Sequence, residues 1–177
     1  LTALVGGYFV MKSLKAKVSQ KVGQTIGENI AEKAFQQATG QKADVSADGE
    51  TVSIKTGEGT MSASEEGKIK LPSDFPSDVF MYPDAKISFA ISTPANAASG
   101  TTAGYVVSYS VSQSSADVVA KYKAEMVKNG WTIGTEANYG SVMINFEKGN
   151  KEVVVAVGES QDGKAGTAEV SVTGSEK

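Results

Sequence analysis

The chain lacks cysteine, histidine and arginine, so lysine supplies all 17 of its basic side chains. Conventional zinc and copper sites are excluded, because those metals prefer thiolate or imidazole ligands. The same absences exclude Ser–His and Cys–His nucleophile pairs. Without arginine, no guanidinium group can hold a phosphate through two parallel hydrogen bonds, which disfavours nucleotide recognition. We therefore expect no enzymatic activity, no catalytic residue, no metal site and no cofactor.

A strong excess of either charge is also lacking, since 17 lysines nearly balance 20 acidic residues and the net charge of the 177 residues is only −3. A nucleic-acid partner would require a basic face, so none is expected. The length allows an N-terminal segment followed by one domain of roughly 100 to 135 residues, which is enough to bury a core.

An apolar run covers residues 1–11, and the sequence begins with Leu1 rather than methionine. As a helix this run would be about 16 Å long, against a hydrocarbon core of about 30 Å. Two interpretations stay open: part of a transmembrane helix that begins upstream, or a segment left by cleavage before it, as in pilin-like precursors. Both predict an extracytoplasmic protein, at the cell surface or anchored in the membrane, that meets a membrane at least during biogenesis.

Residues 12–38 have the pattern of a helix and contain no proline. Apolar side chains recur every four residues from Leu14 to Ala34, beside a row of small residues. Gly23 and Gly27 belong to that row, and their spacing allows another helix to come close. A glycine inside a helix costs roughly 1 kcal/mol relative to alanine, so we expect close packing to offset that cost. The helix could instead pack on its own domain, an alternative that the pattern leaves open.

After Gly40 the hydrophobic pattern changes to a period of two, which indicates β-strands. Asp48-Gly49 is a hairpin signal, so residues 41–70 are expected to form a β-meander or a set of edge hairpins. Three prolines then keep residues 71–86 extended.

Two long strands are predicted at residues 86–93 and 102–113. A helix follows, with Ser114 and Ser115 as candidate N-caps, and runs to about Asn129, with a stop at Gly130. Four more strands are expected near residues 131–134, 142–147, 153–158 and 168–173. The order β-β-α-β-β-β-β predicts an α+β fold: a long N-terminal helix followed by an antiparallel β-sheet domain with one packed helix. The expected segments are an N-terminal helix (1–40), a β-hairpin region (41–70) and an α+β extracytoplasmic domain (71–177).

A proline-rich motif carries a resemblance to a known group of proteins. The motif reads Leu71-Pro72-Ser73-Asp74-Phe75-Pro76-Ser77-Asp78-Val79, then Tyr82-Pro83-Asp84-Ala85-Lys86, with Tyr122 and Asn129-Gly130-Trp131 later in the chain. It resembles a group of uncharacterised bacterial envelope proteins that have an N-terminal membrane segment and the pattern LPxDFPxDVxxYPxAK. This resemblance covers residues 38–177 and implies an extracytoplasmic location without an assigned activity. A weaker resemblance to type IV pilin-like subunits is architectural, and Val5 stands where those subunits have glutamate.

Few other residues suggest a site. Asp74, Asp78 and Asp84 are clustered, but their spacing matches no EF-hand, so turn formation and capping are favoured over calcium binding. Ser53-Ile54-Lys55 matches no Ser–Lys catalytic motif. The aromatic residues could form a binding surface, but core positions are favoured. They are Tyr82, Tyr105, Tyr109 and Trp131.

These patterns predict a non-catalytic structural subunit of a bacterial cell-surface assembly or filament, which self-associates through its N-terminal helix as a homo-oligomer. The alternative is a membrane-anchored extracytoplasmic domain that binds an envelope ligand or protein partner. The residues expected to pack in the assembly are Leu4, Leu14, Val18, Val22, Gly23, Ile26, Gly27, Ile30 and Ala31.

Overall fold

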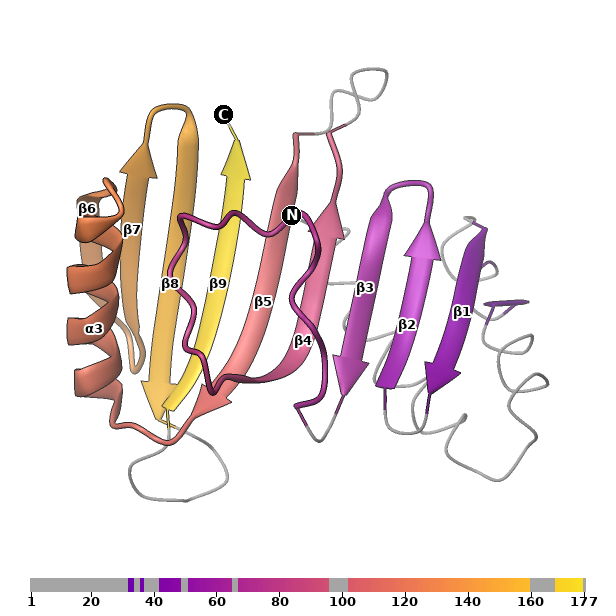
Figure 1. Ribbon diagram of the computed structural model, residues 1–177, viewed down its shortest axis with the longest axis horizontal. Helices are drawn as coiled ribbons and strands as arrows, with labels where there is room; N and C mark the ends of the chain where they lie inside the picture. The colour runs from indigo at the N-terminus through magenta and orange to yellow at the C-terminus, as the bar shows by residue number, and fades with distance from the viewer. Residues whose placement is uncertain are drawn as a thin grey trace.

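One antiparallel sheet organises the chain, with the strands in the spatial order β1-β2-β3-β4-β5-β9-β8-β7-β6 (Figure 1). The computed structural model describes residues 32, 33, 36, 42–48, 51–64, 67–95, 102–159 and 168–176. The strands are β1 (Ala43–Asp48), β2 (Thr51–Thr56), β3 (Gly59–Ser64), β4 (Lys86–Thr93), β5 (Gly104–Val111), β6 (Thr132–Asn138), β7 (Val142–Lys148), β8 (Lys151–Glu159) and β9 (Ala168–Glu176). Helix α3 (Ser115–Lys128) lies between β5 and β6 in the sequence.

Helix α3 begins and ends where the sequence predicts. The Ser114 hydroxyl accepts a hydrogen bond from the Asp117 amide, which satisfies one free donor of the first turn. Gly130 has a φ of +85°, the left-handed conformation that commonly follows a helix. The buried face of α3 is formed by residues about one turn apart: Val118, Tyr122 and Met126.

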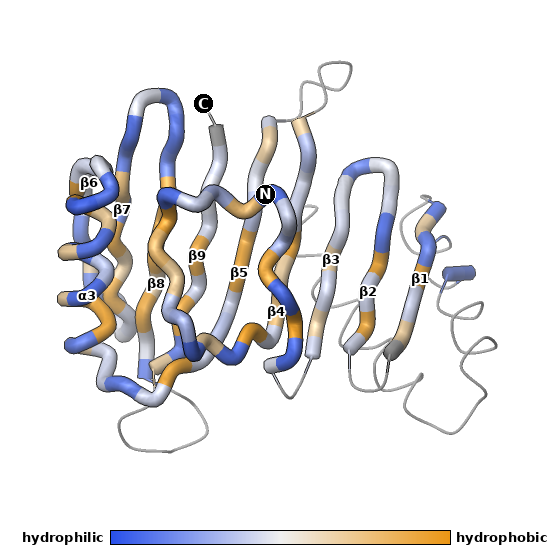
Figure 2. Tube along the Cα trace, in the orientation of Figure 1, coloured by the Kyte–Doolittle hydropathy of each residue, from blue (hydrophilic) through white to orange (hydrophobic). Residues whose placement is uncertain are grey.

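Helix α3 and the connector, residues 67–85, both lie on one side of the sheet, which we call the front face (Figure 1). The main core fills the space beneath them. It combines front-face side chains of β4, β5 and β7–β9 with α3 and with Val79 of the connector. Apolar residues of the connector and of these strands are visible as orange segments in Figure 2.

The buried apolar side chains lie on opposite faces of the sheet on the two sides of β4. On the front face, Val107 of β5 is paired with Ala90 of β4, and Ala90 is paired with the polar Ser62 of β3. On the back face, Ile91 is paired with Met61, and Met61 continues into β2 and β1. A second buried cluster therefore lies on the back face of β1 and β2, and it consists of Val45, Ala47, Val52 and Ile54, each at most 9% exposed.

The predicted fold class, α+β with a long N-terminal helix, is wrong. The described residues are predominantly β, a nine-stranded sheet with α3 packed on it. No long N-terminal helix is evident among them, where only Glu32, Lys33 and Gln36 of that segment are helical; residues 1–31 lie outside the described part. The physical reason is backbone pairing: β3 pairs with β4, so the predicted hairpins add three strands to the sheet.

The division into segments 1–40, 41–70 and 71–177 stays a prediction. Within the described ranges, no helix combines the length and the apolar character needed to cross a bilayer.

Candidate functional site

The predicted assembly residues cannot be placed. Leu4, Leu14, Val18, Val22, Gly23, Ile26, Gly27, Ile30 and Ala31 all lie outside the described residues. Strands of the sheet and the connector, in contrast, lie within the described part and line two cavities.

The resemblance motif comes together around one connector carbonyl. The main-chain oxygen of Asp78 accepts hydrogen bonds from the Trp131 indole at 2.9 Å and from the Asn129 amide at 3.1 Å. Lys148 donates to the Asp78 carboxylate and to the Asn129 carbonyl, each at 2.8 Å. The connector is thus tied to the end of α3 and to β7, so these motif residues have a structural role.

The charge of Asp78 depends on this contact. Partial burial raises the pKa of its carboxyl, but the hydrogen bond and positive charge of Lys148 outweigh that effect and hold the pKa below its usual value. Asp78 is therefore ionised and paired at neutral pH, which does not suit a general acid.

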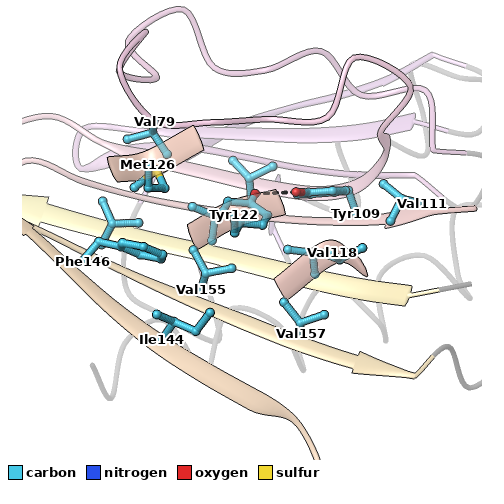
Figure 3. Close-up of a cluster of buried hydrophobic side chains, with 14 of the residues drawn as sticks. Val79, Tyr109, Val111, Val118, Tyr122, Met126, Ile144, Phe146, Val155 and Val157 are labelled. Carbon is cyan, nitrogen blue, oxygen red and sulfur yellow. Dashed lines mark hydrogen bonds between the residues drawn. The ribbon is translucent and has the colours of Figure 1, made fainter. Parts of the chain in front are cut away.

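Aromatic side chains fill the space between α3 and the sheet. Tyr109 of β5 and Tyr122 of α3 join their hydroxyl groups in a hydrogen bond (Figure 3). The Phe80 ring meets the rings of Tyr82 and Tyr122 edge-on, with centroids 5.1 Å and 5.3 Å apart. Burial raises the pKa of both Tyr109 and Tyr122, so these hydroxyls stay neutral and serve the core.

A groove of about 410 Å³, lined mainly by hydroxyl-bearing and charged residues, lies beside this core, over the front face of β2–β4. We call it the hydroxyl groove. Its walls are the β2–β3 hairpin, the end of β4 and the first residues of the connector. The lining residues are Lys55, Thr56, Gly57, Gly59, Thr60, Ser62, Lys70, Pro72, Ser73, Asp74, Ala90, Ser92 and Pro94.

Hydrogen bonds fix the walls of the hydroxyl groove. Ser92 of β4 donates to the Asp74 carboxylate, which holds the connector against the sheet. Ser62, which lines the groove, shares a hydrogen bond with Ser53 of β2, with the two hydroxyl oxygens 2.8 Å apart. Lys55 and Lys70 are exposed, so the groove carries two cations and the one anion of Asp74.

A smaller cavity of about 120 Å³ also has Asp74 in its wall. Tyr105 lines it, and the Tyr105 ring is held edge-on against Phe75 with centroids 4.8 Å apart. Burial raises the pKa of the Tyr105 hydroxyl, which stays neutral. The remaining lining residues are Pro76, Ala103, Gly104, Trp131, Lys151, Glu152, Val153 and Ser175.

The three clustered aspartates have separate environments. Asp74 is bonded to Ser92 and Asp78 to Lys148, whereas Asp84 is exposed. Among the residues that the structure describes, no group of three or more acidic side chains could hold a metal ion. The core position expected for aromatic residues is confirmed for Tyr109 and Trp131, which are 2% and 3% exposed.

Sequence reasoning missed the lysines of the groove, Lys55 and Lys70. A signal existed, because polar Ser53 and Lys55 in β2 alternate with apolar Val52 and Ile54. That alternation distinguishes two faces of a strand, but it does not tell which face adjoins the connector.

Comparison with known proteins gives one partial match. A family model described as START domain-like matches residues 91–165, from the end of β4 to just beyond β8. The match covers less than half of the chain and suggests a helix-grip-like arrangement, in which a helix packs across antiparallel strands as α3 does here. No curated protein and no solved structure matches the chain.

Proposed function

We propose that this chain is a non-catalytic, extracytoplasmic domain that binds a polar ligand in the hydroxyl groove. The observation that carries the proposal is the groove itself, about 410 Å³ with five hydroxyl side chains and two lysines in its wall. Small-molecule sites commonly have volumes of about 300 to 1,000 Å³. The envelope location rests on the resemblance of the proline-rich motif.

The lining determines what kind of ligand fits. Ala90, Pro72 and Pro94 are its apolar side chains, and none of them is large or aromatic, so the groove offers no large apolar side chain to pack against a lipid tail or an aromatic ring. A ligand must instead replace the water that solvates the hydroxyls and lysines, which requires polar groups along its length. The START domain-like match favours ligand binding over other roles.

Binding without catalysis agrees with the side chains present. The buried tyrosine hydroxyls bond to each other, and the Asp78 carboxylate is paired with Lys148. In the groove, Asp74 is held by Ser92. The absence of histidine and cysteine from the sequence removes the commonest bases and nucleophiles.

A tryptophan placed in the groove tests the proposal. Thr60 is exposed and lines the groove, so Thr60→Trp fills it without replacing a core residue. Thr173→Trp is the matched control, because Thr173 is an exposed strand residue that pairs with Val106 on the back face. The probe is a pool of soluble glycan fragments released from purified bacterial cell walls, with binding measured by calorimetry.

We expect the unchanged chain and Thr173→Trp to bind the fragments and Thr60→Trp to lose at least tenfold in affinity. Equal binding by the two tryptophan variants would place the ligand elsewhere and overturn the proposal. No binding by the unchanged chain would overturn it as well.

The structural-subunit hypothesis stays a prediction. It depends on Gly23 and Gly27, which lie outside the described residues. Its test is the substitution Gly23→Leu or Gly27→Leu, which should abolish oligomers while the sheet still folds; unchanged assembly in these variants would contradict it.

A further inference from the structure

Asp74 lies in the wall of both cavities, the hydroxyl groove and the smaller Tyr105 cavity. The connector brings it there, with Pro72 lining the first cavity and Pro76 the second. The bond from Ser92 anchors the Asp74 carboxylate to the sheet. A ligand that extends past Asp74 can therefore use both cavities.

The two cavities differ in chemistry. The hydroxyl groove has two lysines, Lys55 and Lys70, and hydroxyl groups that can both donate and accept hydrogen bonds. The smaller cavity has the aromatic ring of Tyr105, half-buried and fixed in position. Gly174 of β9 permits this position, because a Cβ there would overlap the Tyr105 ring.

Other polar ligands fit less well. An extended peptide usually adds to a free strand edge or fills apolar side-chain pockets, whereas the groove lies on the face of paired strands with few apolar residues. A nucleotide phosphate is usually held by arginine or by a glycine-rich loop before a helix, and the groove has neither. A sugar chain needs many hydroxyl partners and an aromatic ring to cover its C–H face.

We propose that the ligand is an acidic glycan that spans both cavities, an inference that rests on the proposed function. The acidic group of one sugar unit binds between Lys55 and Lys70 in the hydroxyl groove. Asp74 accepts hydrogen bonds from the hydroxyls of the sugar chain as it passes. The next unit packs its C–H face against Tyr105 in the smaller cavity.

A matched pair of probes tests the acidic group. Trigalacturonate carries carboxylates, and its full methyl ester has the same sugar chain without the charge. We expect the full chain to bind trigalacturonate at least tenfold more tightly than the ester, and more weakly as salt is raised, because salt screens exposed charges. Monogalacturonate is a single unit that cannot occupy both cavities at once, so it should bind at least tenfold more weakly than the trimer.

Lysine variants locate the contact. Lys55→Gln and Lys70→Gln should each weaken trigalacturonate binding roughly tenfold, since each removes one charge-assisted hydrogen bond. Lys42→Gln removes the same charge from an exposed position outside the groove lining, and it should leave the affinity unchanged.

The outcomes separate this inference from the proposed function. Equal affinity for trigalacturonate and its ester, or equal effects of all three lysine variants, would overturn the acidic-glycan inference while the Thr60→Trp result still stands. Binding to phosphatidylglycerol vesicles without binding to trigalacturonate would overturn it in favour of a lipid headgroup. If the unchanged chain binds neither wall fragments nor trigalacturonate, both proposals fail.

Discussion

The hydroxyl groups of Tyr109 in β5 and Tyr122 in α3 meet in a hydrogen bond that links helix to sheet. Tyr122 is fully buried and Tyr109 is 2% exposed, so each hydroxyl is shielded from water. The Tyr122 hydroxyl also lies 3.9 Å from the sulfur of Met81 in the connector. Three parts of the fold therefore meet at one polar contact within an apolar core.

Removing one hydroxyl should cost more than removing both. Tyr109→Phe or Tyr122→Phe leaves a buried hydroxyl without its main partner, and we expect a loss of about 1 to 3 kcal/mol in the free energy of unfolding. The double variant keeps both rings and leaves no unpaired hydroxyl, so its stability should lie close to that of the unchanged chain. Urea denaturation measures all four proteins, and additive losses in the double variant would contradict the expectation.

The same pair predicts sensitivity to alkaline pH. Burial raises the pKa of Tyr109 and Tyr122 above the ordinary value of 10.0, so the fold holds them neutral while the unfolded chain ionises them near that pH. Their contribution to stability is complete below pH 10 and is lost as the pH rises through the folded values. The melting temperature should therefore fall above pH 10, and less steeply in the Tyr109→Phe/Tyr122→Phe variant. Tyr139→Phe is the control, because Tyr139 is 84% exposed.

The Asp78 carboxyl should make folding stability fall at acid pH, whereas the tyrosines make it fall at alkaline pH. The pKa of the Asp78 carboxyl in the folded protein lies below the ordinary 3.8. The stability that ionised Asp78 contributes is therefore present above pH 3.8 and is lost as the pH falls through its pKa in the fold. The pair with Lys148 is partly exposed and should contribute only about 0 to 1 kcal/mol. Asp78→Asn should therefore be nearly as stable at pH 7 and lose less stability between pH 5 and 3. The Asp78 main-chain carbonyl, and so its bond to Trp131, is retained. A wild-type acid profile in Asp78→Asn would show that other carboxyls dominate.

Two glycines of one turn should differ in their tolerance of alanine. Gly59 has a φ of +150°, and a Cβ there would overlap the Ser92 carbonyl oxygen. A Cβ added at Gly57, in the same turn, would meet no atom within 4 Å. Gly59→Ala should push the β2–β3 hairpin away from β4 and cost about 1 to 3 kcal/mol, whereas Gly57→Ala should cost less than about 1 kcal/mol. Thermal unfolding compares them, and equal stability would contradict the close approach.

Local features were predictable from the sequence. Helix α3 was predictable because its capping residues and its apolar period depend only on neighbours in the chain. The cap and stop residues are Ser114 and Gly130, and the apolar residues one turn apart are Val118, Tyr122 and Met126. The Asp48-Gly49 turn signal likewise separates β1 from β2.

Long-range pairing was not predictable. Strand β5 pairs with β9, and β3 pairs with β4 although the connector separates them in the sequence. Neither pairing produces a local pattern in the sequence. The hydroxyl groove depends on both the β3–β4 pairing and the bond from Ser92 to Asp74. Its residues could therefore be found only after the strands were ordered in space.

The change of face at β4 has a consequence for cooperativity. Ala90 and Ile91 are adjacent in the sequence, yet Ala90 belongs to the main core while Ile91 pairs with Met61 on the opposite side. Truncation at the first position should loosen the region around α3, and truncation at the second should loosen β1–β3. Adjacent residues of β4 can thus belong to two units that open separately, one around α3 and one comprising β1–β3, although both units share this strand.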